Sequence, residues 1–418
     1  MPYSLMVLTW VFLGVLVAAS ATRIWLALRQ VRHVGAHRAA VPASFAASIP
    51  LAAHQKAADY TVAKSRLGMV SVLVHALVLL GVTLGGGLQL LSDLWSSAFA
   101  PGSLAHGTAL LLTLAVALAV IGLPLGLYRV FVLEQRFGFN RMTARLFLSD
   151  LAKQALLAAV LGVPLVLAVL WLMGQMGERW WLYVWLLWMA FVVFVNMLAP
   201  TVILPLFNKL TPITEGEVSS RVKALLERCG FRARGVFLMD GSKRSSHGNA
   251  FFAGFGAAKR IVLFDTLVER LEPPEVEAVL AHELGHYKLH HIVKNLALSA
   301  AVSLAGLWLL GQLIDEAWLY QGLGVSTPST AAGLALFLLV VPEFLFFLDP
   351  LTSRYSRKHE FEADAYATAH ADRAELERAL VKLYRDNAAT LTPDPLHSAF
   401  YDSHPPAAVR IARLKEAT

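Results

Sequence analysis

The sequence predicts a mainly α-helical integral membrane protein with seven transmembrane helices. Its 418 residues are 57% hydrophobic and only 16% charged, whereas soluble domains carry about 25% charged residues. Seven apolar runs are each long enough to cross a bilayer as a helix, which takes about 20 residues. One long polar segment, 207–294, separates the fifth run from the sixth. We therefore expect a helical membrane domain that carries a second, polar domain.

The predicted spans lie near 4–28, 67–92, 107–133, 151–174, 180–206, 295–314 and 330–349. The first is followed by Arg23 and Arg29 and has no clear small-residue cleavage site, which favours a retained span over a signal peptide. Glu343 lies inside the seventh run. An ionisable side chain at that depth either lines a wet cavity or pairs with another group, and both alternatives stay open.

Charges in the loops predict the topology. Basic residues crowd the loops after the first and third spans, whereas no Lys or Arg occurs at 93–106 or 315–329. The positive-inside rule then places loops one, three and five and the C-terminal tail in the cytoplasm. The polar segment and the tail therefore face the same side and can share one site. The net charge of +7 reflects these loops, and no motif indicates nucleic-acid binding.

The motif His282-Glu283-Leu284-Gly285-His286 indicates a zinc site. Residues four apart share one helix face, so two imidazoles can hold one Zn²⁺ beside a carboxylate that handles a water. The segment from Pro273 begins a helix in the expected way, and apolar residues follow at core spacing. The single cysteine, Cys229, excludes a disulfide and a cysteine-rich zinc site, so histidines and carboxylates must supply the ligands.

The third ligand is expected from the tail. His290 lies eight residues after His282, about 12 Å along the helix and too far to share one ion; it and His291 are predicted to be interfacial. Glu360 and Asp364 are four apart on one face, so one can bind zinc while the other orients a ligating histidine. Glu362 points elsewhere at that spacing.

These residues predict four segments: 1–206 with five spans, 207–294 with the zinc motif, 295–349 with two spans, and 350–418 completing the site.

Zinc would lower the pKa of a bound water to about 7, and Glu283 would accept its proton and pass it to a leaving amine. A further donor to the reacting oxygen is expected from His404 or Arg410, although His404 could instead cap a turn before two prolines.

A small β-sheet should accompany the zinc helix. Segments 242–252 and 259–265 resemble two strands around a turn with Gly254 and Gly256. An edge strand beside the motif can bind a peptide by strand addition, with Asn249 and Ala250 as the expected main-chain contacts. A hairpin that only braces the helix is the alternative.

Taken together, these motifs resemble the CAAX prenyl protease 1 family, seven-span integral-membrane zinc metalloendopeptidases. The matching stretches are Phe137-Gly138-Phe139-Asn140, 204–212, 241–247, Asn249-Ala250-Phe251, 260–267, 282–288, 360–364 and Ser403-His404-Pro405-Pro406. The resemblance implies seven helices around a water-filled chamber with the zinc site at its cytoplasmic end. It also implies cleavage of prenylated C-terminal CAAX peptides just after the modified cysteine.

By position, the resemblance makes His282, His286 and Glu360 the ligands of one Zn²⁺ and Glu283 the base. Asp364 would not bind the metal but would support its ligands. Further site residues follow in the same way: Asn249, Ala250 and Phe251 fall on the substrate strand, and His404 and Arg410 lie near the reacting carbonyl.

Glu362 stands where the family leads us to expect glutamine. Composition favours a bacterial inner membrane over the endoplasmic reticulum membrane of a eukaryote. Alternative functions are quality control of membrane proteins and, from another class, a channel or transporter with structural zinc.

Overall fold

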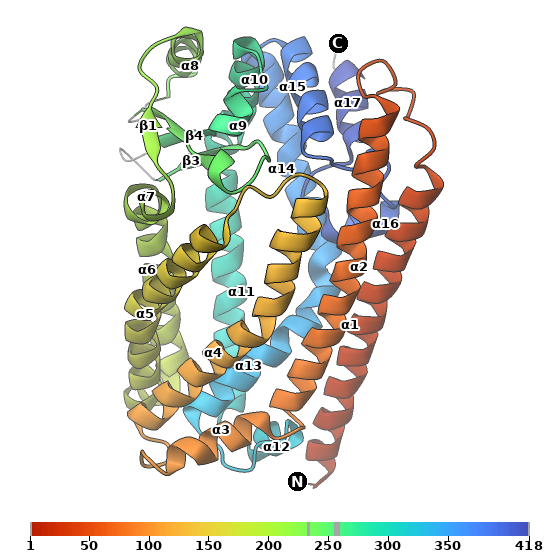
Figure 1. The fold of residues 1–418 in the computed structure, drawn as a ribbon. Helices are drawn as coiled ribbons and strands as arrows, with labels where there is room; N and C mark the ends of the chain where they lie inside the picture. Colours follow the sequence, from red (N-terminus) through yellow and green to blue (C-terminus); the bar gives the residue numbers. More distant parts are fainter. Residues whose placement is uncertain (1, 232–234, 255–259, 417–418) are drawn as a thin grey trace.

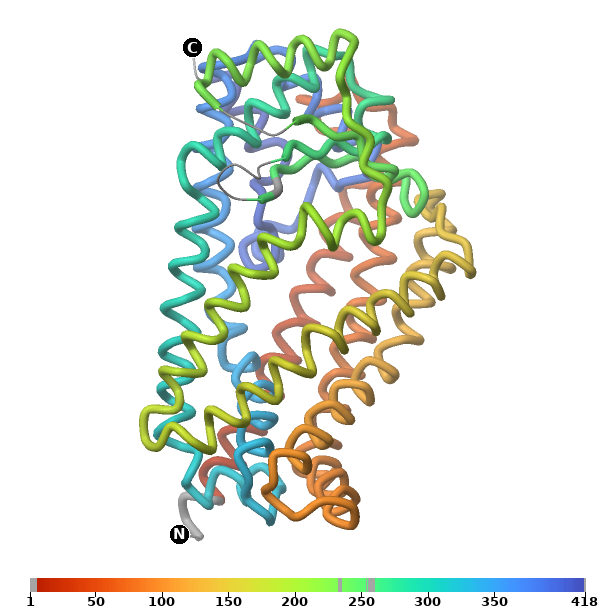
Figure 2. Tube along the Cα trace, turned by 90° about the vertical axis from the view of Figure 1, so that its left-hand side faces the viewer, coloured from red at the N-terminus to blue at the C-terminus, as the bar shows by residue number. Residues whose placement is uncertain are grey.

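The computed structural model describes residues 2–231, 235–254 and 260–416 and contains the seven predicted helices that are long and apolar enough to cross a membrane. They are α1 (Pro2–Ala36), α2 (Leu51–Val82), α4 (Leu104–Tyr128), α5 (Ala144–Gln175), α6 (Trp180–Leu198), α11 (His291–Leu313) and α13 (Thr330–Leu345). The N-terminus lies at one end of this bundle, and the polar segment and the C-terminus lie at the other (Figures 1 and 2).

The second span differs from the prediction at both ends. We expected it near 67–92, but α2 begins at Leu51 and ends at Val82, and a separate helix, α3 (Gly87–Ser96), follows. Gly86 adopts a left-handed φ of 77° between the two helices, which is a conformation that favours glycine. At 1.5 Å per residue α2 is longer than the bilayer core is thick, so its N-terminal turns extend toward the polar domain.

The seventh span continues directly into the tail. After α13 a short 3₁₀ turn (Phe346–Leu348) leads into α14 (Asp349–His370). This nearly continuous helical run carries the tail from the membrane to the polar segment, and Figure 1 shows α14 beside α10 at the C-terminal end. Both halves of the predicted site therefore lie at the same end of the bundle.

Glu343 within the seventh span is buried and paired. Its carboxylate accepts from Arg23 of α1 at 2.6 Å and contacts His75 Nε2 of α2 at 2.8 Å. The structure therefore favours the pairing alternative, and the three side chains tie α1 and α2 to α13.

The polar domain contains a four-stranded sheet in the order β1-β2-β4-β3. Its strands are β1 (Leu210–Pro212), β2 (Val236–Met239), β3 (Ala250–Ala253) and β4 (Arg260–Phe264). β2 and β4 run parallel, and β3 pairs antiparallel with β4 at the edge of the sheet, with Ala250 opposite Leu263. The expected pair of strands and its edge position are present, but the first strand was predicted too long. Of segment 242–252, only Ala250–Phe252 lie in β3, and Gly241–Lys243 form a 3₁₀ turn. Gly256 of the expected turn and Lys259 lie outside the described residues.

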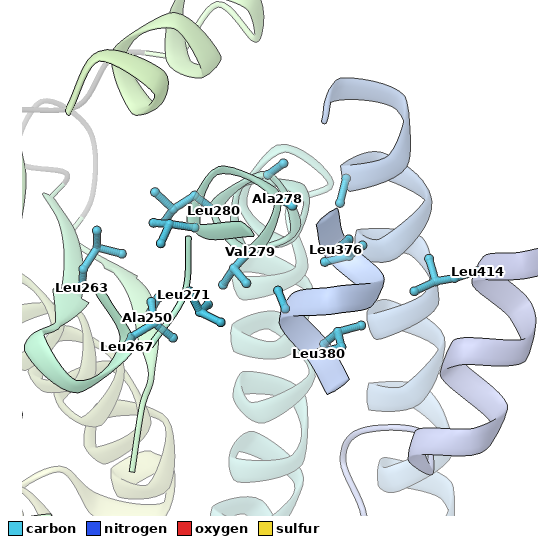
Figure 3. Close-up of a cluster of buried hydrophobic side chains, with 14 of the residues drawn as sticks. Ala250, Leu263, Leu267, Leu271, Ala278, Val279, Leu280, Leu376, Leu380 and Leu414 are labelled. Atoms are coloured by element: carbon cyan, nitrogen blue, oxygen red, sulfur yellow. The ribbon is translucent and has the colours of Figure 1, made fainter. Parts of the chain in front are cut away.

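Helix α10 (Pro273–Lys288) occupies the centre of the polar domain. It begins with a capping box, in which Glu272 and Glu275 each accept from the other's backbone N–H, and with proline in its first turn. Its apolar residues Val276, Val279, Leu280 and Leu284 are all buried, as predicted. The first three pack between the sheet and α15 (Arg373–Asp386), with α17 (Ala407–Glu416) beyond (Figure 3).

Smaller helices complete the domain. They are α7 (Leu204–Phe207), α8 (Glu217–Arg228), α9 (Asp265–Val268) and α16 (Pro395–Tyr401), with α12 (Ala317–Gly322) at the opposite end of the bundle.

Arg244 joins the sheet region to the membrane helices. Its guanidinium donates to the buried Asp150 of α5 at 2.7 and 2.9 Å and to the Asn208 side chain at 2.8 Å.

We predict that Gly285 sets the distance between α10 and α14. A Cβ added at this position would lie 3.0 Å from Ala363 Cα, so the α14 backbone would have to move. Overpacking of this kind costs about 1–3 kcal/mol. Gly285→Ala should therefore lower the thermal unfolding midpoint of the detergent-solubilised protein. Gly14→Ala in α1 is the matched control, because nothing lies within 4 Å of its added Cβ; equal midpoints for the two variants would contradict the prediction.

Candidate active site

Three potential ligand side chains converge where α10 crosses α14. His282 and His286 come from α10, and Glu360 comes from α14. The two Nε2 atoms lie 3.2 Å apart. Glu360 Oε2 lies 3.5 Å from His282 Nε2, and Oε1 lies 3.2 Å from His286 Nε2. The close approach of the helices at Gly285 and Ala363 makes this convergence possible.

These spacings fit a metal ion of zinc's size. In a tetrahedral site with bonds of about 2.0–2.1 Å, neighbouring ligand atoms lie roughly 3.3–3.4 Å apart. The three observed distances are close to this value, although the two histidines are nearest to different oxygens of Glu360. Glu360 Oε2 is buried and has no hydrogen-bond partner among the described residues, which is costly for a carboxylate oxygen unless a cation meets it. Three ligands leave the fourth position for water or substrate.

Asp364 and Arg410 surround His282. Asp364 Oδ1 lies 2.9 Å from His282 Nδ1, which favours a proton on Nδ1 and a lone pair on Nε2. Arg410 Nη2 also lies near this ring, 3.0 Å from Nδ1 and 3.3 Å from Nε2. Arg410 Nε and Nη2 donate to the two Asp364 oxygens at 2.7 and 2.6 Å. All three side chains are buried. Arg410 Nη1 lies 3.6 Å from Glu360 Oε2, so one guanidinium balances both carboxylates.

Glu283 faces a cavity of about 260 Å³ beside the candidate ligands. Desolvation raises the pKa of its carboxyl, and the nearby His282 and His286 oppose that rise. A carboxyl whose pKa is shifted upward binds a proton more readily than an ordinary glutamate, which suits a group that accepts a proton and passes it on.

His404 reaches the same region from the tail. Its Nε2 lies 3.5 Å from Glu360 Oε1, and its Nδ1 is 3.0 Å from Ser403 Oγ. Desolvation lowers the pKa of this imidazole. The side chain lines both the smaller cavity and a larger one of about 680 Å³, which also share Tyr384 and Ala389. Tyr384 was not singled out from the sequence, because an isolated tyrosine carries no motif.

Asn249 and Ala250 line the smaller cavity, as do His282 and Glu283. β3 pairs only with β4 among the described strands, so its outer edge is available to an extended peptide. Phe251 is not among the residues that line this cavity; its ring lies 6.2 Å from that of Phe264.

The prediction that His291 is interfacial was wrong. His291 is buried, and its Nδ1 lies 3.0 Å from His286 Nδ1. The α-helix breaks at His290, whose φ is 60°, and this break brings His291 back toward the site. Glu362 points away from the ligands, as predicted, but it reaches His291 Nε2 at 2.9 Å. No helical spacing in the sequence signals this contact.

Comparisons with known proteins agree with this architecture. Residues 30–209 match the CAAX prenyl protease N-terminal family of five membrane helices, and residues 212–418 match peptidase family M48. A CAAX prenyl protease 1 homolog of Dictyostelium discoideum is 38% identical, with 68% of this chain and 67% of that protein covered. A probable CAAX prenyl protease 1 of Schizosaccharomyces pombe is 31% identical over 94% of this chain and 86% of its own.

The crystal structure of S. mikatae Ste24p superimposes with a TM-score of 0.88 at 29% identity, and the match covers 97% of this chain and 98% of that one. Family matches of both halves, relatives along most of the chain and a shared seven-helix fold lead to one conclusion. The chain belongs to the membrane-embedded metalloproteases of peptidase family M48.

Proposed function

We propose that this protein is a zinc endopeptidase that cuts prenylated CAAX-type substrates near their C-terminus. The observation that carries the proposal is the convergence of His282, His286 and Glu360 beside Glu283, in a cavity bordered by an edge strand. The substrate class is supported by the CAAX prenyl protease relatives. The basic loops at this end of the bundle support a site that faces the cytoplasm. The expectation of a bacterial inner membrane is supported by composition alone.

His282, His286 and Glu360 would hold one Zn²⁺, which when bound polarises the scissile carbonyl and acidifies a water. Asp364 would keep the proton of His282 on Nδ1, since it accepts from that nitrogen at 2.9 Å. Glu283 would take the proton from the water and deliver it to the leaving amine, a role that its raised pKa supports.

His404 and Arg410 would stabilise negative charge that develops on the carbonyl oxygen. His404 is the less constrained of the two, because its imidazole lines both cavities and is largely exposed, with Ser403 Oγ at 3.0 Å and Glu360 Oε1 at 3.5 Å. Arg410 is held by two hydrogen bonds to Asp364, which leaves Nη1 directed toward Glu360. Arg410 would therefore act mainly by keeping a positive charge fixed behind the ligands.

The substrate backbone would add to the outer edge of β3 at Asn249 and Ala250, with Phe251 next along the strand. Strand addition holds a peptide with little demand on its side chains. The larger cavity meets the smaller one at His404 and has apolar walls at Met69, Val72 and Phe346. Such walls suit the lipid chain of a prenylated cysteine.

Glu283→Gln should retain zinc and lose turnover. Glutamine preserves the shape of the side chain but cannot accept a proton, and general acid–base catalysis contributes about 10²–10⁴-fold. Peptide cleavage by the purified variant should fall by at least about 10²-fold, with a zinc content equal to that of the wild type. Wild-type peptide cleavage by the zinc-loaded variant would contradict the role of Glu283 as the base. Zinc-loaded wild-type protein that cleaves no peptide would instead favour a structural metal in a channel or transporter.

Glu360→Ala should lose most of the bound zinc, because two histidines alone form an incomplete site. Zinc content after dialysis against a weak chelator measures this loss. Glu215→Ala, at an exposed position in the polar segment, is the control for removing a glutamate. Full zinc retention in Glu360→Ala would overturn the proposed ligand set.

A prenylated CAAX peptide should be cleaved with at least about a tenfold higher kcat/KM than the same peptide without its lipid. Burial of two CH₂ groups, at about 0.8 kcal/mol each, is already enough for that factor. Competition between the two peptides and an unfolded membrane protein tests the substrate class. No preference for the lipid, together with faster cutting of the unfolded protein, would favour membrane-protein quality control.

A further inference from the structure

The two histidines of the motif have different partners on their outer edges. His282 Nδ1 meets the carboxylate of Asp364 directly, at 2.9 Å. His286 Nδ1 instead meets another imidazole, that of His291, with 3.0 Å between the two Nδ1 atoms. The far nitrogen of His291, Nε2, lies 2.9 Å from Glu362 Oε2. His286 is therefore linked to a carboxylate through one intervening ring.

The direction of these hydrogen bonds follows from the role proposed for His286. A histidine that offers the Nε2 lone pair to a metal carries its proton on Nδ1, so His286 donates to His291 Nδ1. His291 must then accept at Nδ1 and carry its own proton on Nε2, where it donates to the Glu362 carboxylate. Each of the two hydrogen bonds then has one donor and one acceptor.

The protein holds His291 in place for this contact. The side chain is buried, and the left-handed residue His290 redirects the chain so that the ring returns toward His286. The His291 ring stacks on that of His359, with centroids 4.0 Å apart and planes 7° from parallel. Nitrogen lone pairs lie in the ring plane, so those of two parallel rings do not converge on one ion. The cluster is therefore better arranged for hydrogen bonding than for a second metal.

We propose that Glu362 and His291 are positioning residues that hold His286 in its metal-binding tautomer and orientation. This inference rests on the proposed function, in which His286 Nε2 binds zinc. The Glu362 carboxylate polarises His291, which makes its Nδ1 a stronger acceptor and His286 a stronger ligand. Asp364 makes His282 a stronger ligand by direct contact with its Nδ1. Loss of an outer partner of this kind typically weakens metal binding about 10–100-fold.

The test is the zinc dissociation constant of the full-length protein in detergent, measured by competition with a chelator. Glu362→Ala removes the acceptor and should weaken zinc binding about 10–100-fold. Glu362→Gln keeps an acceptor but loses the charge, so its dissociation constant should fall between those of Glu362→Ala and the wild type. Lys358→Met is the matched control, because Lys358 Nζ lies 3.7 Å from Glu362 Oε1 on the same helix; it should leave the constant within twofold of the wild type.

A double-mutant cycle tests whether Glu362 acts on His286 through His291, an arrangement that we call the relay, or whether Glu362 and His291 affect zinc binding independently. His291→Phe keeps an aromatic ring for the stack but removes both nitrogens. Because Glu362 acts only through His291, adding Glu362→Ala to His291→Phe should weaken zinc binding no further. Additive losses, or a Glu362→Ala constant within twofold of the wild type, would overturn the relay. A wild-type protein that binds no zinc would instead contradict the proposed function itself.

Discussion

The close packing of α10 against α14 is the contact on which the rest of the site depends. One helix carries the HExxH motif and the other carries the candidate carboxylates, and 74 residues separate His286 from Glu360 in the chain. Gly285 faces Ala363 with no room for a side chain between them. A wider separation would pull Glu360 away from both imidazoles, and the three ligand atoms would no longer surround a single point.

Membrane topology makes that packing possible. α11 leads away from the polar domain and α13 returns, and the continuous run from α13 into α14 delivers the tail to the end where α10 lies. A second contact between the polar domain and the membrane helices is the pair of hydrogen bonds from Arg244 to the buried Asp150 of α5. The membrane helices thus fix where the two halves of the site can meet.

Charge balance gives the site a second constraint. Glu283, Glu360 and Asp364 bring three carboxylates into one enclosed region, and Arg410 supplies one positive charge against them. Uncompensated charge in a low-dielectric site is expensive. A divalent cation at the candidate ligands would add positive charge beside these carboxylates, so the donor set and the electrostatics support the same occupant. The buried Arg410 then serves both the stability of the site and the charge facing a substrate.

The sequence by itself determined the seven helices, the motif helix and the edge strand, because each depends on local periodicity that is visible along the chain. It also placed both parts of the site on one side of the membrane, since loop charge is a local property. Only the tertiary structure decided the limits of α2, which is separated from α3 by a turn with the left-handed Gly86, and the pairing of Glu343 with Arg23 and His75. It alone brought His291 and Glu362 to the motif. These features arise from a backbone break and from packing between distant helices, and neither follows from residue spacing.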